Sequence, residues 1–149
     1  QNWTGFAARP AGFSPGGRKS EFPGYYLGID AEQVHVGGGL FMASPEVLKK
    51  VRIHIANNME GLVKLAEDKN FTSTFGTLQG EKSKRLDKTL LSAAEKSELI
   101  YHKQFYVFTQ FPIAAFYGST QLFDEIIKHF TLVRPLNQYL DCVFQQQTQ

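Results

Sequence analysis

The stretch PGYYLGIDAEQVHVGGGLFM, residues 23–42, decides how the rest of this 149-residue chain is arranged. Two runs rich in Tyr, Ile, Val and Phe flank residues 30–32, Asp-Ala-Glu. This pattern predicts two antiparallel strands joined by a tight polar turn. Because side chains alternate along a strand, Tyr25, Leu27 and Ile29 are expected on one face of the hairpin.

Three consecutive glycines, Gly37, Gly38 and Gly39, interrupt the second strand. Each glycine weakens a strand by roughly 0.5–1 kcal/mol relative to Ala, so something must offset them. One interpretation is packing: the strand bends, or its backbone lies close to another group. The other is an anionic ligand approached by exposed backbone N–H groups. The stretch is not a phosphate-binding fingerprint, because no Gly-x-Gly-x-x-Gly opens a helix and no Gly-Lys-Ser/Thr follows.

Composition and charge narrow the class of protein. The chain is 42% hydrophobic and 20% charged, which is typical of a globular protein, and residues 1–149 are expected to form a single domain. A net charge of +2 is too small to support nucleic-acid binding, and no apolar run reaches the length of a membrane span. One cysteine allows no internal disulfide and suits a reducing, cytoplasmic location.

Helix signals follow the hairpin. Ser44-Pro45-Glu46 predicts a helix start with a capping Ser and a Pro in the first turn. Apolar residues recur at helical spacing as far as Leu62, with Asn57-Asn58 as a break before a second helix over 60–68. Further helices are expected over residues 70–76, from 93 to about 100 or 101, from 119 or 120 to 130, and over 136–144, the last one allowed by Pro135.

Residues 102–111, His-Lys-Gln-Phe-Tyr-Val-Phe-Thr-Gln-Phe, give the strongest strand pattern after the hairpin. Apolar side chains on both faces predict an interior strand that is covered at least partly on both sides. Strands therefore concentrate early and helices late, without regular alternation. The predicted fold class is α+β, a small antiparallel sheet with helices packed mainly on one face.

Several segments resemble the domain-of-unknown-function family numbered 2461. The matching motifs cover nearly the whole chain and keep their order: GGRKS at 16–20, PGYYLxI at 23–29, VxVGGGLF at 34–41, PxxLxxxRxxI at 45–55, FxxxFG at 71–76, KxFYV at 103–107 and RPLxxYL at 134–140. The resemblance implies no particular activity, cofactor or catalytic residue.

Two departures from the family pattern bear on the fold. Family members usually begin with a helical segment and a strand rich in Arg and Asp, so the chain is expected to correspond to the C-terminal two-thirds of the family domain. The usual Pro-Lys-Gly turn after the basic strand is replaced here by RLDKT at 85–89. Without the leading strand, an open sheet edge could pair with a second copy, so a homo-oligomer is one expectation.

The titratable residues form no recognisable catalytic or metal-binding pattern. The histidines are His35, His54, His102 and His129, and no two of them have the spacing of metal ligands. Cys142 lies among apolar residues of a predicted helix, which predicts a buried, inert thiol. We therefore expect no metal and no cofactor.

The best candidate site is a cleft beside the glycine strand. Cations, tyrosine hydroxyls and glycine backbone together suit a small anionic ligand. The competing interpretation is that these residues only join helix to sheet; Arg52 in particular could border an apolar stripe or point toward the hairpin. The predicted ligand-binding residues are Arg18, Lys19, Tyr26, His35, Gly37, Gly38, Gly39, Arg52, Lys103 and Tyr106.

Two classes of function remain open. The first is a ligand-binding or protein-interaction module, which the absence of a catalytic pattern favours. The second is an enzyme that acts on an anionic small molecule or nucleic acid beside Gly37–Gly39, which would require convergent polar groups in a pocket.

Overall fold

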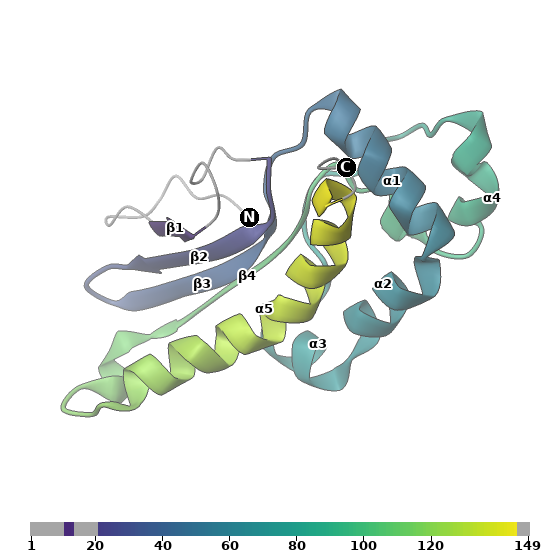
Figure 1. Ribbon diagram of the computed structural model, residues 1–149. Coiled ribbons are helices and arrows are strands. Elements are labelled where there is room, and N and C mark those ends of the chain that lie inside the picture. Colours follow the sequence, from purple (N-terminus) through teal and green to yellow (C-terminus); the bar gives the residue numbers. More distant parts are fainter. Residues whose placement is uncertain (1–10, 14–20, 146–149) are drawn as a thin grey trace.

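The computed structural model of the chain describes residues 11–13 and 21–145, and it has the predicted α+β architecture (Figure 1). One antiparallel sheet carries the strands in the order β1-β2-β3-β4. The strands are β1 (Ala11–Phe13), β2 (Gly24–Ile29), β3 (Gln33–Leu40) and β4 (Phe105–Pro112). The pattern Asn-Trp-Thr-Gly-Phe-Ala-Ala predicts a short strand over residues 2–8, which lies outside the described residues. Residues 9–22 are rich in Gly and Pro and predict a loop, but β1 falls within them.

The predicted hairpin is confirmed. β2 and β3 pair antiparallel, with Leu27 opposite Val36 and Tyr26 opposite Gly37. Asp30 closes the turn, because its Oδ1 accepts hydrogen bonds from the backbone N–H groups of Glu32 (2.8 Å) and Gln33 (2.7 Å). A short acidic side chain that bonds the backbone two residues on is a standard way to fix a tight turn.

The helices that follow the hairpin begin as the sequence predicted. Ser44 caps α1 by accepting a hydrogen bond from the Val47 N–H (3.2 Å). The chain then breaks at Asn58, and the third helix ends at Gly76, whose φ of 76° suits a glycine. The helices up to this point are α1 (Pro45–Asn57), α2 (Met59–Glu67) and α3 (Lys69–Phe75).

The helix predicted from residue 93 to about 101 is wrong. The chain instead forms η3 (Lys88–Leu90), a short α4 (Leu91–Ala94) and a separate 3₁₀ turn, η4 (Glu98–Tyr101). Ser97 causes the interruption, because its hydroxyl accepts a hydrogen bond from the Leu99 N–H (3.2 Å) and so starts a new turn. Ser side chains compete with helix hydrogen bonds in this way.

The C-terminal half holds one long helix where the sequence predicted two. After η5 (Ile113–Phe116), α5 runs from Gln121 to Gln145 with Pro135 inside it. Val133 and Leu136, on either side of the proline, are both completely buried, so packing holds the helix together across the break in its hydrogen bonds. α5 lies along one face of the sheet (Figure 1), and its most extensive packing is on β3.

β4 is the last strand of the sheet, so the predicted interior position is wrong. It begins at Phe105, three residues later than predicted. Among the described residues its outer side meets no further strand: isolated bridges join Gln79 to Tyr106 and, just before the strand, Lys82 to His102. Its faces are nevertheless covered, because Phe105 and Phe108 are buried on opposite sides. Coverage of the faces, and not a neighbouring strand, therefore explains the apolar pattern.

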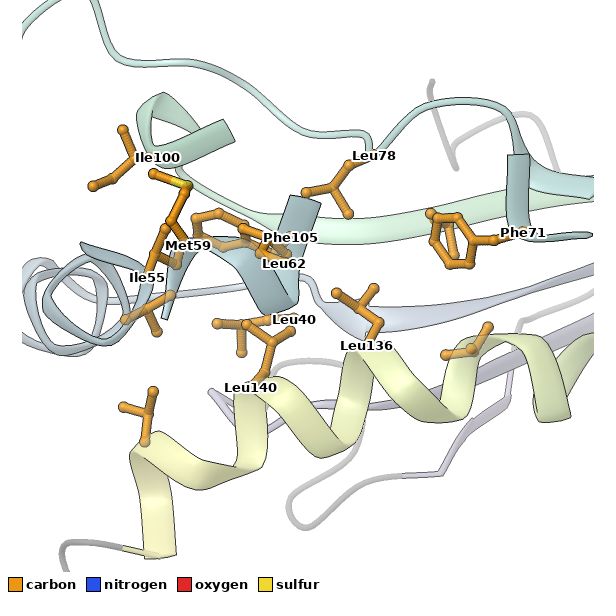
Figure 2. Packing of buried hydrophobic residues seen from close by; sticks show 14 of the residues in the cluster. Leu40, Ile55, Met59, Leu62, Phe71, Leu78, Ile100, Phe105, Leu136 and Leu140 are labelled. Atoms are coloured by element: carbon orange, nitrogen blue, oxygen red, sulfur yellow. The ribbon is translucent and has the colours of Figure 1, made fainter. Parts of the chain in front are cut away.

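The hydrophobic core lies between the sheet and the helices (Figure 2). Side chains from both halves of the chain meet there, and many are completely shielded from solvent. The largest such residues include Leu40, Ile55, Leu62, Ile100, Phe105, Leu136 and Leu140. The segment that contains η3, α4 and η4 is thus anchored on the same core as the sheet, through Ile100.

Candidate functional site

The three glycines allow close packing. A Cβ on Gly38 would collide with Val133 Cγ1 of α5 and lie 2.7 Å from the Gly24 carbonyl oxygen. A Cβ on Gly39 would lie 2.6 Å from the Tyr106 Cα, and one on Gly37 would lie 2.9 Å from the Phe108 Cα, both in β4. Since all three glycines are also paired within the sheet, the geometry supports the packing interpretation.

Several of the predicted site residues share the sheet face opposite α5. Tyr25 packs on Phe130 of α5 at 5.1 Å between ring centroids, so Tyr26 points the other way. Tyr26, Phe41 and Tyr106 form a row on that opposite face, with ring centroids 5.0 and 4.8 Å apart. We call this surface the far face. His35, Gly37 and Gly39 also belong to it.

His35 and Asp30 form the one histidine–carboxylate pair in the described part of the chain. The His35 Nε2 lies 3.0 Å from the Asp30 Oδ2, and the His35 ring stacks on Phe108 at 6.0 Å. The hydrogen bond from His35, followed by those from the Gln33 and Glu32 N–H groups, lowers the pKa of Asp30 to about 2. A carboxylate so fixed can orient an imidazole for proton transfer or simply brace the turn.

Arg52 does not reach the glycine strand. Its Nη2 donates to the Ser83 Oγ (2.9 Å) and to the carbonyl oxygens of Tyr101 (3.0 Å) and His102 (3.2 Å). Lys103, the next residue along, lies 4.0 Å from the Glu81 carboxylate. Both cations therefore hold the segment before β4. Arg18 and Lys19 lie outside the described residues.

Two absences in the described part of the chain concern metal-binding groups and membrane-spanning helices. Within residues 11–13 and 21–145, no group of three His, Cys, Asp or Glu side chains is placed to hold a metal ion. Among the helices of those same residues, none combines the length and apolarity that crossing a bilayer requires.

A hollow of about 530 Å³ lies between α2, the start of α3 and α5. We call it the α2–α5 groove. Its apolar wall is formed by Leu65, Phe71 and Leu132. Lys64, Asp68, Gln138 and Thr131 supply the polar groups, and Gly61, Pro135 and Tyr139 complete the lining.

A second, larger hollow of about 1020 Å³ adjoins the first and shares Gly61, Lys64 and Tyr139 with it. The Tyr139 hydroxyl donates to the Asn58 carbonyl oxygen (2.8 Å), and burial raises the pKa of Tyr139 to about 12. The His54 ring packs against the same ring, tilted by 54° with the centroids 4.7 Å apart, and burial lowers the pKa of His54. Cys142 also lines this hollow and is exposed, so the predicted buried thiol is wrong.

The comparison with protein families decides the relationship that the sequence motifs suggested. The model of the conserved hypothetical protein family DUF2461 matches residues 5–139. The chain belongs to this family. Searches of the curated proteins and of the solved structures each found no significant match.

The groove of this DUF2461 member was missed at the sequence level because its walls come from helices about 70 residues apart. Lys64 and Asp68 fit the pattern of an ordinary amphipathic helix, and nothing in their spacing indicates a pocket. One signal was present: Pro135 lies inside a stripe of apolar residues at helical spacing. A proline that packing keeps within a helix leaves a carbonyl group without its partner, which can mark a binding surface.

Proposed function

We propose that this DUF2461 chain is a ligand-binding module and that the α2–α5 groove receives the ligand. One observation carries the proposal: the groove joins an apolar wall to a small set of polar groups at its rim. Its volume of about 530 Å³ falls within the range of about 300–1,000 Å³ that is usual for small-molecule sites.

The groove is suited to binding more than to catalysis. Tyr139 uses its hydroxyl to hold Asn58, and its raised pKa keeps it protonated at neutral pH, so it offers the ligand a ring and not a base. Phe71 and Leu132 give apolar contact, while Lys64 and Asp68 are exposed. Such a lining fixes orientation through a few polar contacts and gains affinity from buried apolar area.

The alternative is an enzyme that uses the far face. It is favoured by the Asp30–His35 pair, which lies at one end of the face that carries Tyr26 and Tyr106. Burial, with a contribution from Glu81, raises the pKa of the Tyr106 hydroxyl above its ordinary value. A histidine held by a carboxylate beside hydroxyl donors is a plausible acid–base arrangement for an anionic substrate.

A titration of the ¹⁵N-labelled chain with a library of small molecules tests both candidates. Chemical-shift changes confined to residues 61–71 and 131–139 would support the groove. Changes confined to residues 26–39 and 106–108 would instead favour the far face. If no library member perturbs either set at millimolar concentration, the ligand-binding proposal fails and a protein partner becomes the better hypothesis.

A further inference from the structure

The two charged groups of the α2–α5 groove have no ionic partners among the described residues. Lys64 and Asp68 are four residues apart and both line the groove. In the part of the chain that the structure describes, neither forms an ion pair, with each other or with a third residue. Asp68 does cap α3, since its Oδ2 accepts a hydrogen bond from the Phe71 N–H (3.1 Å). Its second carboxylate oxygen, Oδ1, accepts no hydrogen bond from a described residue.

Pro135 adds a backbone acceptor to the same surface. In an α-helix the carbonyl of residue 131 bonds the N–H of residue 135, and proline has no N–H. The Thr131 carbonyl therefore lacks its usual helical partner. Thr131 and Pro135 both line the groove, so this acceptor lies beside it. The Thr131 hydroxyl is already engaged, as it donates to the Ile127 carbonyl (2.8 Å).

We infer that the α2–α5 groove binds a small zwitterion with an apolar side chain, that is, an apolar α-amino acid. This inference rests on the proposed function. The ligand's ammonium group meets the Asp68 carboxylate and the Thr131 carbonyl, and its carboxylate meets Lys64. Its side chain lies on the apolar wall of Phe71 and Leu132. Each ligand group thus meets a complementary group, with no charge left over.

The arrangement of charges selects against simpler ligands. A purely anionic ligand would place its charge near Asp68, and a purely cationic one would place its charge near Lys64. Losing a charge-assisted hydrogen bond costs about 1.5–3 kcal/mol, which corresponds to at least about tenfold in affinity. An analogue that lacks one of the two charges should therefore bind at least about tenfold more weakly.

Three probes test the ligand class directly. The three probes share a branched carbon chain and differ in charge. L-Leucine carries both charges, isopentylamine carries the positive charge alone, and 4-methylpentanoate carries the negative charge alone. Titration of the labelled chain should give shifts around the groove with all three, with leucine binding at least about tenfold more tightly than either analogue. Equal binding of leucine and one analogue would overturn the inference while leaving the groove as a ligand site. Shifts elsewhere, or none, would overturn the inference and the groove together.

Two variants, each lacking one charge of the groove, test which residues bind the ligand, and Asp68→Asn has a matched control. Asp68→Asn keeps an oxygen that can cap α3 but removes the negative charge. Lys64→Met keeps an unbranched apolar stem and removes the positive charge. Each should weaken leucine binding about tenfold. Asp87→Asn is the control, because Asp87 caps η3 through the Thr89 N–H (2.9 Å) and lies outside the groove. If Asp68→Asn and Asp87→Asn bind leucine equally well, Asp68 has no role.

Pro135→Ala separates binding from folding. Alanine supplies the missing N–H to the Thr131 carbonyl and also favours the helix, so the variant should melt at a higher temperature. Leucine binding should nevertheless weaken, because the acceptor is now occupied. Loss of affinity in a more stable protein cannot be ascribed to unfolding. Unchanged affinity would remove the Thr131 carbonyl from the inferred site.

Discussion

At the residue scale, the glycine strand shows how a single missing side chain sets the distance between two elements. Gly38 lets α5 approach β3 so closely that a Cβ would overlap Val133, which is completely buried. Gly37 and Gly39 allow the same close approach to the backbone of β4. Gly39 also has a φ of 118°, where other residues are strained. The cost of three glycines in one strand is thus offset by packing on two sides.

Gly38→Ala should therefore destabilise the protein by about 1–3 kcal/mol, the usual range for overpacking a tight core. Urea denaturation followed by circular dichroism measures the loss. In the double variant with Val133→Ala, part of the loss should be recovered, because the shorter side chain removes the collision with Cγ1. Strictly additive losses would show that Val133 is not the obstacle and that the Gly24 carbonyl, 2.7 Å away, dominates.

Asp30 gives a residue-scale prediction about pH. Its pKa is lowered to about 2 in the folded protein, chiefly by the His35 hydrogen bond, whereas an unfolded Asp has a pKa near 3.9. The stabilisation is present above the unfolded value and is lost as the pH falls through the folded value. Asp30→Asn keeps the turn acceptor, so it should be less stable than wild type at pH 6 and approach it near pH 2.

Unfolding free energies measured from pH 6 to pH 2 check this expectation. Asp124→Asn is the control, because the Asp124 side chain is exposed and its carboxylate accepts no hydrogen bond from residues 11–13 or 21–145. A stability difference between Asp30→Asn and wild type that does not change across this pH range would contradict a bond to the ionised carboxylate.

At the element scale, Arg52 joins a helix to an irregular segment. Its Nη2 contacts Ser83, Tyr101 and His102, which lie on the two sides of the excursion from residue 83 to 102. The Ser83 N–H also donates to the Tyr101 carbonyl (2.8 Å), so the two sides are joined directly as well. Arg52 thus fixes α1 against a segment with little regular structure of its own.

Removing the Arg52 hydrogen bonds should destabilise the segment from residue 83 to 102 more than the rest of the fold. Arg52→Ala is expected to cost about 1–3 kcal/mol and to speed amide hydrogen exchange at Ser83 and Lys103, whose N–H groups bridge the two sides. Lys50→Ala is the control on the same helix, since Lys50 forms only an exposed pair with Glu46 and should change stability by less than about 0.5 kcal/mol. Equal exchange rates in both variants would show that Arg52 is not the anchor.

The elements also show where sequence reasoning works and where it does not. The hairpin and the start of α1 were predictable, because alternation, a turn carboxylate and a capping Ser act between near neighbours. Pro135 was misjudged because the burial of Val133 and Leu136 decides the outcome, and burial is a property of the packed molecule. The break at Ser97 was missed because either a continued helix or a new turn satisfies its hydroxyl.

At the scale of the whole molecule, the candidate sites depend on which distant residues meet. The sequence put Tyr26 and Tyr106 in one candidate cleft, but the register that brings them together through Phe41 comes from long-range pairing, which no local pattern specifies. Arg52 was assigned to the same cleft because helix spacing alone cannot tell which segment a long side chain will reach. The α2–α5 groove depends wholly on helix packing, which no local pattern specifies.

The core makes a last prediction about cooperativity. Leu140 of α5 is completely buried in the cluster that also contains Leu40 of β3 and Ile100 of η4, so sheet, helices and excursion share one core (Figure 2). Leu140→Ala should cost about 2–5 kcal/mol and shift a single unfolding transition. Leu91→Ala, at a leucine that is 46% exposed, should cost under about 1 kcal/mol. Two separate transitions in Leu140→Ala would show that the residues 21–145 do not unfold as one unit, since a shared core must lose its stability everywhere at once.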